Sequence, residues 1–396
     1  MDKNKRLTVW LPVIIAASIA LGIFIGNHYL SISQGKKRSY SSGNKINAIL
    51  DIIDEQYVDT VSMSKLVEST IPKIFSELDP HSVYIPAEDA SVVNEELEGS
   101  FSGIGVSFNM QTDTILVISV ISGGPAEKAG LLPFDRIISI NDSIFSGKKK
   151  NQGEIMKTLR GAKNSTVKLG VQRGNSPELL YFDVTRGDVP VNSVDVSYEA
   201  AKGIGYIKVS KFARNTYNEF ITAIAKLKQA GCTSFVIDLR GNTGGYMDAA
   251  INMINEFMPE GRLIVYTEGK SFPRSDVYAN GTGTCKDAPI VVLTDEISAS
   301  ASEIFSGAIQ DNDRGTIIGR RTYGKGLVQT QMSLSDGSEM RLTIARYYTP
   351  SGRCIQKKYE MGNTDAYDQD IYNRYMHGEF DSADSIKMDD SLKYQT

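Results

Sequence analysis

Three serines lie in the segment Ser298-Ala299-Ser300-Ala301-Ser302-Glu303, between a predicted buried strand, Pro289 to Thr294, and a predicted helix. A serine at a helix N-terminus can act as a nucleophile, because the helix dipole and the free backbone N–H groups there stabilise an oxyanion. The pair Ser300 and Glu303 also has the spacing of a capping box. The segment alone therefore leaves both a catalytic and a structural interpretation open.

A nucleophilic serine needs a base, and histidine is scarce. The chain has three histidines, none lies between residues 82 and 376, and no Gly-x-Ser-x-Gly elbow surrounds the serines, so a Ser-His-Asp triad has no recognisable context. Lysine is the remaining option. Lys325 has glycine on both sides, on a turn that enters a predicted strand. Burial that lowers its pKa from about 10.4 toward 7–8 would make it a base. Gln329, four residues on, can hold the amine by a hydrogen bond.

A glycine turn follows the buried strand at Val236 to Leu239, in the segment Asp238 to Gly245. Gly244 and Gly245 permit close backbone approach, which suits an N–H group of an oxyanion hole. A tight turn without a catalytic role is the alternative on this segment alone.

Several other classes of function are excluded. Gly319 to Lys325 nearly matches a phosphate loop, but Gly326 lacks the hydroxyl that binds Mg²⁺, and a predicted strand follows instead of a helix. The motifs G-x-G-x-x-G and His-Glu-x-x-His are absent, so we expect no dinucleotide, metal or other cofactor. A net charge of −4 argues against nucleic acid as a partner.

The elements that must position these residues fall into several units. With 396 residues, 41% hydrophobic and 23% charged, the chain is neither collagen-like nor disordered nor a polytopic membrane protein. Helical periodicity over 47–57 and 64–78 predicts a small helical unit. Short β-type runs follow from about Ser100. Beyond Asn192, strands and helices alternate, which predicts an α/β core. The expected core strands are 204–209, 235–239, 264–267, 290–294 and 316–319, and the expected core helices are 218–228, 247–257 and 302–310.

A membrane helix is expected at the front. Lys3, Lys5 and Arg6 precede the apolar stretch Val9 to Ile25, which with its flanks nears the roughly 20 residues needed to cross a bilayer. The basic residues place the N-terminus in the cytoplasm and the rest of the chain on the periplasmic side. A cleaved signal peptide is the competing interpretation, with a small-residue site near Ala20.

The β-type runs from Phe101 to Gly187 resemble a PDZ domain. The turn Gly103-Ile104-Gly105 can direct N–H groups at a terminal carboxylate, and the strand edge from Val106 can pair with the peptide backbone. The segment Gly124 to Leu131 (GPAEKAGL) stands at the distance expected for this domain. A β-domain without a ligand is the alternative.

With this PDZ-like unit ahead of them, the serine run, the glycine turn and the lysine turn resemble the C-terminal processing (tail-specific) serine peptidases, over about Ile46 to Gln356. In that family the lysine follows the nucleophile by 25 positions, which here selects Ser300 with Lys325, and the supporting glutamine corresponds to Gln329. The resemblance implies an oxyanion hole from the N–H groups of Ala301 and Gly244. It further implies a crotonase-like core with an inserted PDZ domain that gates access to the active site.

We therefore predict a Ser-Lys endopeptidase that recognises the free C-termini of protein or peptide substrates. An inactive, membrane-anchored PDZ scaffold is the alternative, and a homo-oligomer is one of the assembly states left open. The expected parts are a membrane anchor (1–38), a linker with the helical unit (39–99), the PDZ domain (100–187), the peptidase core (188–358) and an acidic tail (359–396). The Gly-Ile-x-Pro-Asp stretch that typically follows the segment Tyr347 to Arg353 in this family is absent. We thus expect a core sheet that is incomplete or completed by a strand from elsewhere.

Overall fold

A computed structural model describes residues 16–21, 23, 42–111, 114–145, 152–174 and 176–386. The chain divides into two compact units, Met1–Thr70 and Ile71–Thr396. Apart from residues 16–21 and 23, which are helical, the predicted anchor at Val9 to Ile25 lies outside the described residues. Within the described ranges, no helix is both long enough and apolar enough to span a membrane.

The helical unit agrees with the periodicity of its apolar residues. Helices α2 (Ser42–Gln56) and α3 (Met63–Ser76) correspond to the predicted helices 47–57 and 64–78, with different bounds. Helix α2 therefore begins five residues earlier than predicted, at Ser42. Helix α4 (Ala87–Glu98), which the periodicity did not reveal, ends at Gly99 with a φ of 75°.

The PDZ-like unit is a sheet with two helices packed on it. Its strand order is β3-β4-β5-β7-β8, with β6 paired to β5. The buried side chains of these strands and of both helices form one apolar cluster, so the unit has a core of its own. The elements are β3 (Val106–Gln111), β4 (Thr114–Val120), α5 (Pro125–Ala129), β5 (Arg136–Ile140), β6 (Ser143–Ile144), α6 (Gln152–Leu159), β7 (Thr166–Gln172) and β8 (Leu180–Thr185).

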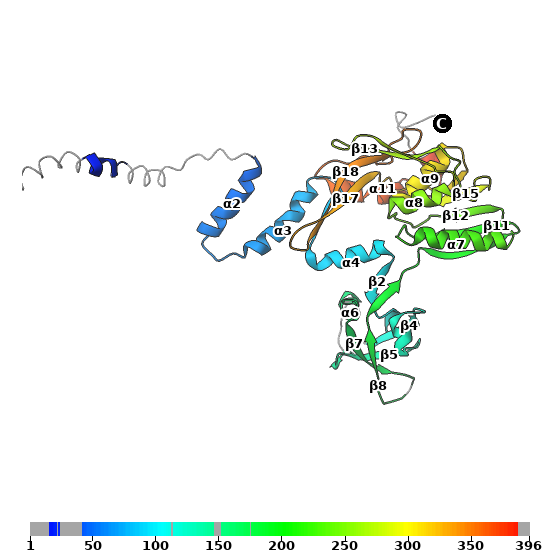
Figure 1. The fold of residues 1–396 in the computed structure, drawn as a ribbon, viewed down its shortest axis with the longest axis horizontal. Coiled ribbons are helices and arrows are strands. Elements are labelled where there is room, and N and C mark those ends of the chain that lie inside the picture. Colours follow the sequence, from blue (N-terminus) through cyan, green and yellow to red (C-terminus); the bar gives the residue numbers. More distant parts are fainter. Residues whose placement is uncertain are drawn as a thin grey trace, which may run out of the picture. The chain divides into compact units, whose positions relative to one another are not determined.

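A two-stranded ribbon carries the chain into and out of this unit. Strand β2 (Ser100–Gly103) pairs antiparallel with β9 (Gly187–Pro190), and Gly103 lies opposite Gly187. Figure 1 shows this ribbon between the PDZ-like elements and the remaining sheets. Entry and exit of the chain are therefore neighbours in space.

The α/β core contains a largely parallel sheet in the order β10-β11-β12-β15-β16. Strands β11, β12, β15 and β16 are parallel, and β10 pairs antiparallel with β11. Three of the predicted strands, 204–209, 290–294 and 316–319, are confirmed with the predicted bounds. They are recognisable because they are short runs of strand-forming residues bounded by turn residues. The elements are β10 (Val194–Ala201), β11 (Ile204–Val209), β12 (Ser234–Asp238), β15 (Ile290–Thr294) and β16 (Thr316–Gly319).

A second sheet and three helices complete the core. Its strands run in the order β1-β18-β13-β14, and β17 pairs with β18. Helices α7, α8 and α9 contribute side chains to one apolar cluster with the parallel sheet. The elements are β1 (Val83–Ile85), α7 (Thr216–Gln229), α8 (Met247–Asn255), β13 (Leu263–Glu268), β14 (Ser275–Tyr278), α9 (Ala301–Asp311), β17 (Leu327–Ser333) and β18 (Glu339–Tyr348).

The described part of the acidic tail, residues 359–386, contains short helices. It contains α10 (Thr364–Asp368), α11 (Asp370–Met376) and the short 3₁₀ helix η1 (Ala383–Ser385). Tyr367 and Arg374 are each only 4% exposed, so this segment packs as part of the fold. Cys232, Cys285 and Cys354 are free thiols.

Candidate active site

Ser300 differs from its two neighbouring serines. Ser298 and Ser302 are fully buried, and their hydroxyl groups donate to the carbonyl oxygens of Leu239 and Asn242, at 2.8 and 2.9 Å. Ser300 is partly exposed and has a φ of 53° and a ψ of −111°, which is a strained backbone for a residue other than glycine. Strain of this kind clusters at functional sites. The geometry therefore singles out Ser300 at the start of α9.

One buried carboxylate ties the serine segment to the lysine turn. The side chain of Glu303 accepts the N–H groups of Ser300, Gly324 and Lys325 and the hydroxyl of Thr322, at distances from 2.6 to 2.8 Å. Burial raises the pKa of Glu303, while these hydrogen bonds oppose the rise. The Ser300 N–H bond to Glu303 belongs to the capping box that the spacing predicted, and this capping box is confirmed. The same carboxylate also fixes the lysine turn.

Lys325 is half-buried, and its surroundings disfavour the charged amine. Burial lowers the pKa of Lys325, the positive charge of Arg341 lowers it further, and the negative charges of Asp79 and Glu303 oppose these effects. Among the residues that the structure describes, the Nζ atom has no hydrogen-bond or ion-pair partner, and only the backbone N–H is engaged. A lysine in such surroundings is suited to accept a proton.

Gln329 contacts the loop before β1 and not the lysine amine. Its Nε2 donates to the backbone carbonyl of His81, and no hydrogen bond joins it to Lys325 within the described part of the chain. The sequence-based expectation that Gln329 holds the amine is thus not realised in this conformation. Its Oε1 remains the atom that can accept from an ammonium group.

His81 is poorly suited to act as the catalytic base. Its Nε2 lies 2.9 Å from the hydroxyl of Tyr367, and burial together with the nearby charge of Lys325 lowers the pKa of His81 to about 4. The loop that carries it is held by the buried carboxylate of Asp79, which accepts the N–H groups of His81 and Ser82, both at 3.0 Å. The loop thus fixes the carbonyl that Gln329 contacts.

The glycine turn lies directly against the serine. A Cβ atom on Gly244 would stand 2.8 Å from the Cβ of Ser300 and 2.7 Å from the carbonyl oxygen of Ala299, so only glycine fits there. The Gly244 N–H donates to Oδ1 of Asn242 at 2.8 Å. The N–H of Ala301 donates no hydrogen bond within the described ranges. Of the two predicted oxyanion-hole donors, the Ala301 N–H is therefore available, whereas the Gly244 N–H already donates to Asn242.

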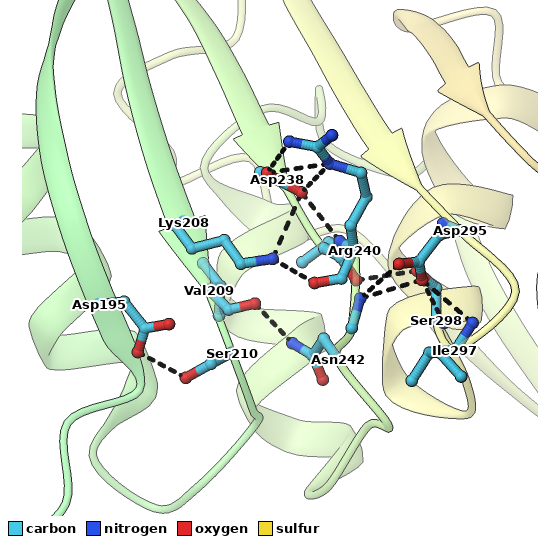
Figure 2. A network of polar contacts seen from close by, with 12 residues as sticks. Asp195, Lys208, Val209, Ser210, Asp238, Arg240, Asn242, Asp295, Ile297 and Ser298 are labelled. Atoms are coloured by element: carbon cyan, nitrogen blue, oxygen red, sulfur yellow. Dashed lines mark hydrogen bonds and ion pairs between the residues drawn. The ribbon is translucent and has the colours of Figure 1, made fainter.

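Asn242 is a fully buried residue to which the sequence analysis assigned no role. Its Nδ2 donates to the carbonyl of Val209, and its own carbonyl accepts the Ala299 N–H as well as the Ser302 hydroxyl. Figure 2 shows the amide of Asn242 directed toward Val209. Asn242 therefore fastens the glycine turn to both β11 and the start of α9.

Behind this turn lies an ionic network, drawn in Figure 2. Arg240 and Lys208 both contact the buried Asp238, and the carboxylate of Asp295 accepts the Gly241 N–H. Burial would raise the pKa of Asp238, but hydrogen bonds from Arg240 and Tyr206 lower it to about 2. The network borders an open polar pocket of about 700 Å³ that none of the predicted site residues lines. The pocket's lining residues are Tyr206, Lys208, Asp238, Arg240, Thr294, Asp295, Gly319 and Arg320.

The predicted peptide-binding residues meet at an apolar groove between β3 and α6. Ile104, Gly105 and Val106 line a cavity of about 70 Å³, whereas Gly103 is in the adjoining ribbon and does not line it. In the described part of the chain, the N–H groups of Ile104 and Gly105 donate no hydrogen bond. The remaining lining residues are Phe101, Phe108, Met156, Leu159 and Arg160.

Comparison with known proteins decides the family. The model of peptidase family S41 matches residues 203–365, and a PDZ domain model matches residues 102–195. The chain is 33% identical over 365 residues to a probable CtpA-like serine protease of Staphylococcus aureus (strain N315), covering 90% of this chain and 72% of that protein. The chain belongs to peptidase family S41. The expected resemblance to PDZ-containing C-terminal processing serine proteases is thereby confirmed.

Two further relatives of this S41 chain carry related names. The carboxy-terminal processing protease CtpB of Bacillus subtilis (strain 168) is 35% identical over 318 residues, which cover 80% of this chain and 66% of that protein. A solved structure, the photosystem II D1 C-terminal processing protease, is 28% identical with a TM-score of 0.45 and covers 80% of this chain and 91% of that one.

Proposed function

We propose that this S41 protein is an endopeptidase that reads substrate C-termini through its PDZ domain and cleaves with a Ser300–Lys325 dyad. The observation that carries the proposal is the Glu303 carboxylate, which binds the backbone of the strained Ser300 and of the half-buried Lys325 at 2.8 Å each. A dyad needs its two members held in fixed relation, and this shared anchor supplies one.

The reaction follows acyl-enzyme chemistry. The neutral amine of Lys325 takes the proton of the Ser300 hydroxyl while Oγ bonds to the peptide carbonyl carbon. The N–H groups of Ala301 and Gly244 stabilise the resulting oxyanion. The Lys325 ammonium, held by Oε1 of Gln329, then protonates the leaving amine as the C–N bond breaks. Water, losing a proton to Lys325, attacks the acyl group, and the proton returns to Ser300 as the ester bond breaks.

The proposal requires Gly244 to exchange partners, since its N–H donates to Asn242 without substrate. Catalytic hydrogen bonds often align only in the substrate complex, so this geometry is compatible with the assignment. The proposal also includes the crotonase-like nature of the core and the apolar segment from Val9 to Ile25 as a membrane anchor that leaves the catalytic part on the periplasmic side. It needs no metal ion or other cofactor.

Tail dependence tests the proposed function. The substrate is an unstructured protein with an apolar C-terminus, compared with the same protein carrying a C-terminal carboxamide. Free N–H groups at Ile104 and Gly105 favour a carboxylate, and charge-assisted hydrogen bonds contribute about 1.5–3 kcal/mol. We expect amidation to lower kcat/KM roughly tenfold or more, measured by mass spectrometry of the products. Equal cleavage of both proteins would contradict C-terminal recognition, and tail binding without any cleavage would favour the scaffold.

The pH dependence of cleavage tests Lys325 as the base. Since kcat/KM rises with pH as the base loses its proton, a lowered pKa of Lys325 moves the acid limb to lower pH. Replacing Arg341 with glutamine removes a positive charge that lowers this pKa, so the limb should move to higher pH. The control is Arg346→Gln, which removes an exposed arginine from the same strand. A limb that stays in place in Arg341→Gln would argue against Lys325 as the base.

A further inference from the structure

The C-terminal segment from Thr364 to Glu379 packs against the turn that carries Lys325. Its most buried side chains, Tyr367 and Arg374, are each 4% exposed although the surrounding sequence is polar and acidic. Both direct polar atoms at the loops around the dyad. The segment therefore has contacts that its composition does not explain.

Arg374 provides the first connection. Its guanidinium donates to the backbone carbonyls of Arg321 and Thr322, the latter at 3.1 Å. Its charge is balanced by Glu379, at 2.8 Å from Nε, and Glu379 also binds the guanidinium of Arg321 in a bidentate pair. A buried guanidinium that donates in several fixed directions restricts the backbone it contacts.

Thr322 passes this restraint toward the dyad. While its carbonyl accepts Arg374, its hydroxyl donates to Oε1 of Glu303 at 2.7 Å. Glu303 in turn accepts the N–H groups of Lys325 and Ser300. The lysine turn is thus held between the nucleophile's helix on one side and the C-terminal segment on the other.

Tyr367 provides a second connection. Its hydroxyl lies 2.9 Å from Nε2 of His81, the residue whose carbonyl accepts Gln329. Lys357 lies 4.0 Å from the ring centre of Tyr367 and 4.2 Å from that of Tyr323 in the lysine turn. The backbone N–H of Lys357 also donates to the carbonyl of Gly324 at 2.9 Å.

We propose that the segment Thr364 to Glu379 is a positioning element of the active site and that Arg374 is its principal positioning residue. The inference rests on the proposed Ser300–Lys325 dyad. It identifies the segment that holds Lys325 in position relative to Ser300. Arg374 acts only through the backbone of the lysine turn, and it contacts neither Lys325 nor Ser300.

The test compares Arg374→Gln and Arg374→Lys with Arg314→Gln in the full chain. Arg314 is a matched control, because its guanidinium also donates to backbone carbonyls, those of Phe257, Cys285 and Ala288, away from the lysine turn. Because small misplacements of catalytic groups cost about 100-fold, we expect Arg374→Gln to lower kcat on that order. KM and tail-peptide affinity should stay unchanged, and Arg374→Lys should retain part of the rate. Arg314→Gln should lower the free energy of unfolding and leave kcat unchanged.

Amide hydrogen exchange provides a measurement that does not depend on proteolysis. Exchange in the peptide from Arg320 to Gly326 should speed up in Arg374→Gln and stay unchanged in Arg314→Gln. Unchanged exchange and kcat in a folded Arg374→Gln, an equal loss of kcat in Arg314→Gln, or a rise in kcat would each overturn the inference. If the parent shows no Ser300-dependent cleavage, the proposed function fails, and the exchange comparison still decides whether the segment restrains the turn.

Discussion

Replacing Ser300 with alanine is expected to remove proteolysis while leaving the protein folded and its PDZ groove intact. Loss of a nucleophile in serine peptidases lowers kcat by at least about 10⁴-fold, and Lys325→Ala should lower it to a similar extent. Because the two residues act as one unit, the double variant should be hardly slower than either single variant. Cleavage of the apolar-tailed protein measures the rates, and calorimetry with a tail peptide measures binding.

Ser306→Ala is the matched control for this experiment. Ser306 lies in the same helix, α9, and is 7% exposed. Among the described residues, its hydroxyl has a single hydrogen-bond partner, the carbonyl of Glu303 at 3.4 Å. Its removal should leave kcat unchanged. Cleavage that persists in Ser300→Ala or in Lys325→Ala, with the control active, would show that the dyad is misassigned.

Glu303→Gln should produce the second largest effect, on stability and on rate together. The carboxylate accepts four donors, and an amide would present N–H groups to two of them. Leaving buried donors unpaired costs about 1–3 kcal/mol each, so we expect the free energy of unfolding to fall by roughly 3 kcal/mol. Loss of the shared anchor should lower kcat by about 100-fold. Urea unfolding and steady-state kinetics measure the two effects.

Glu256→Gln separates the two effects of Glu303. Glu256 is equally buried at 4% exposure and accepts the Tyr217 hydroxyl and the N–H and hydroxyl of Thr284, within the core and away from the serine. It should lose comparable stability with no change in kcat. Equal rate losses in both variants would mean that Glu303 contributes only to folding.

The sequence predicts much of the core because local pattern and burial coincide there. The run Ile290 to Thr294 is short, β-branched and bounded by turn residues, so its strand is recognisable without tertiary information. Strand β10 is different. Most of its residues are exposed and include Asp195 and Glu199, and it becomes a strand only by pairing with β11. Pairing between strands is a tertiary property that local composition does not report.

The candidate site is predictable to a similar, partial extent. Spacing within a family resemblance selects Ser300 and Lys325, and Ser-x-x-Glu spacing identifies Glu303 as a cap. The spacing does not reveal that the same carboxylate reaches Lys325, because the lysine turn enters the site from another part of the chain. Arg374 stands in an acidic tail, where nothing local indicates burial.

Because β2 and β9 form a two-stranded ribbon, the PDZ domain is inserted in the chain at a single point of the fold. Gly103 and Gly187 face each other across two antiparallel strands, so one hairpin turn could bridge the chain if everything between them were cut out. The domain also has an apolar cluster of its own. Exchange for another peptide-binding module therefore requires no rerouting of the core strands, and recognition can diversify separately from the chemistry.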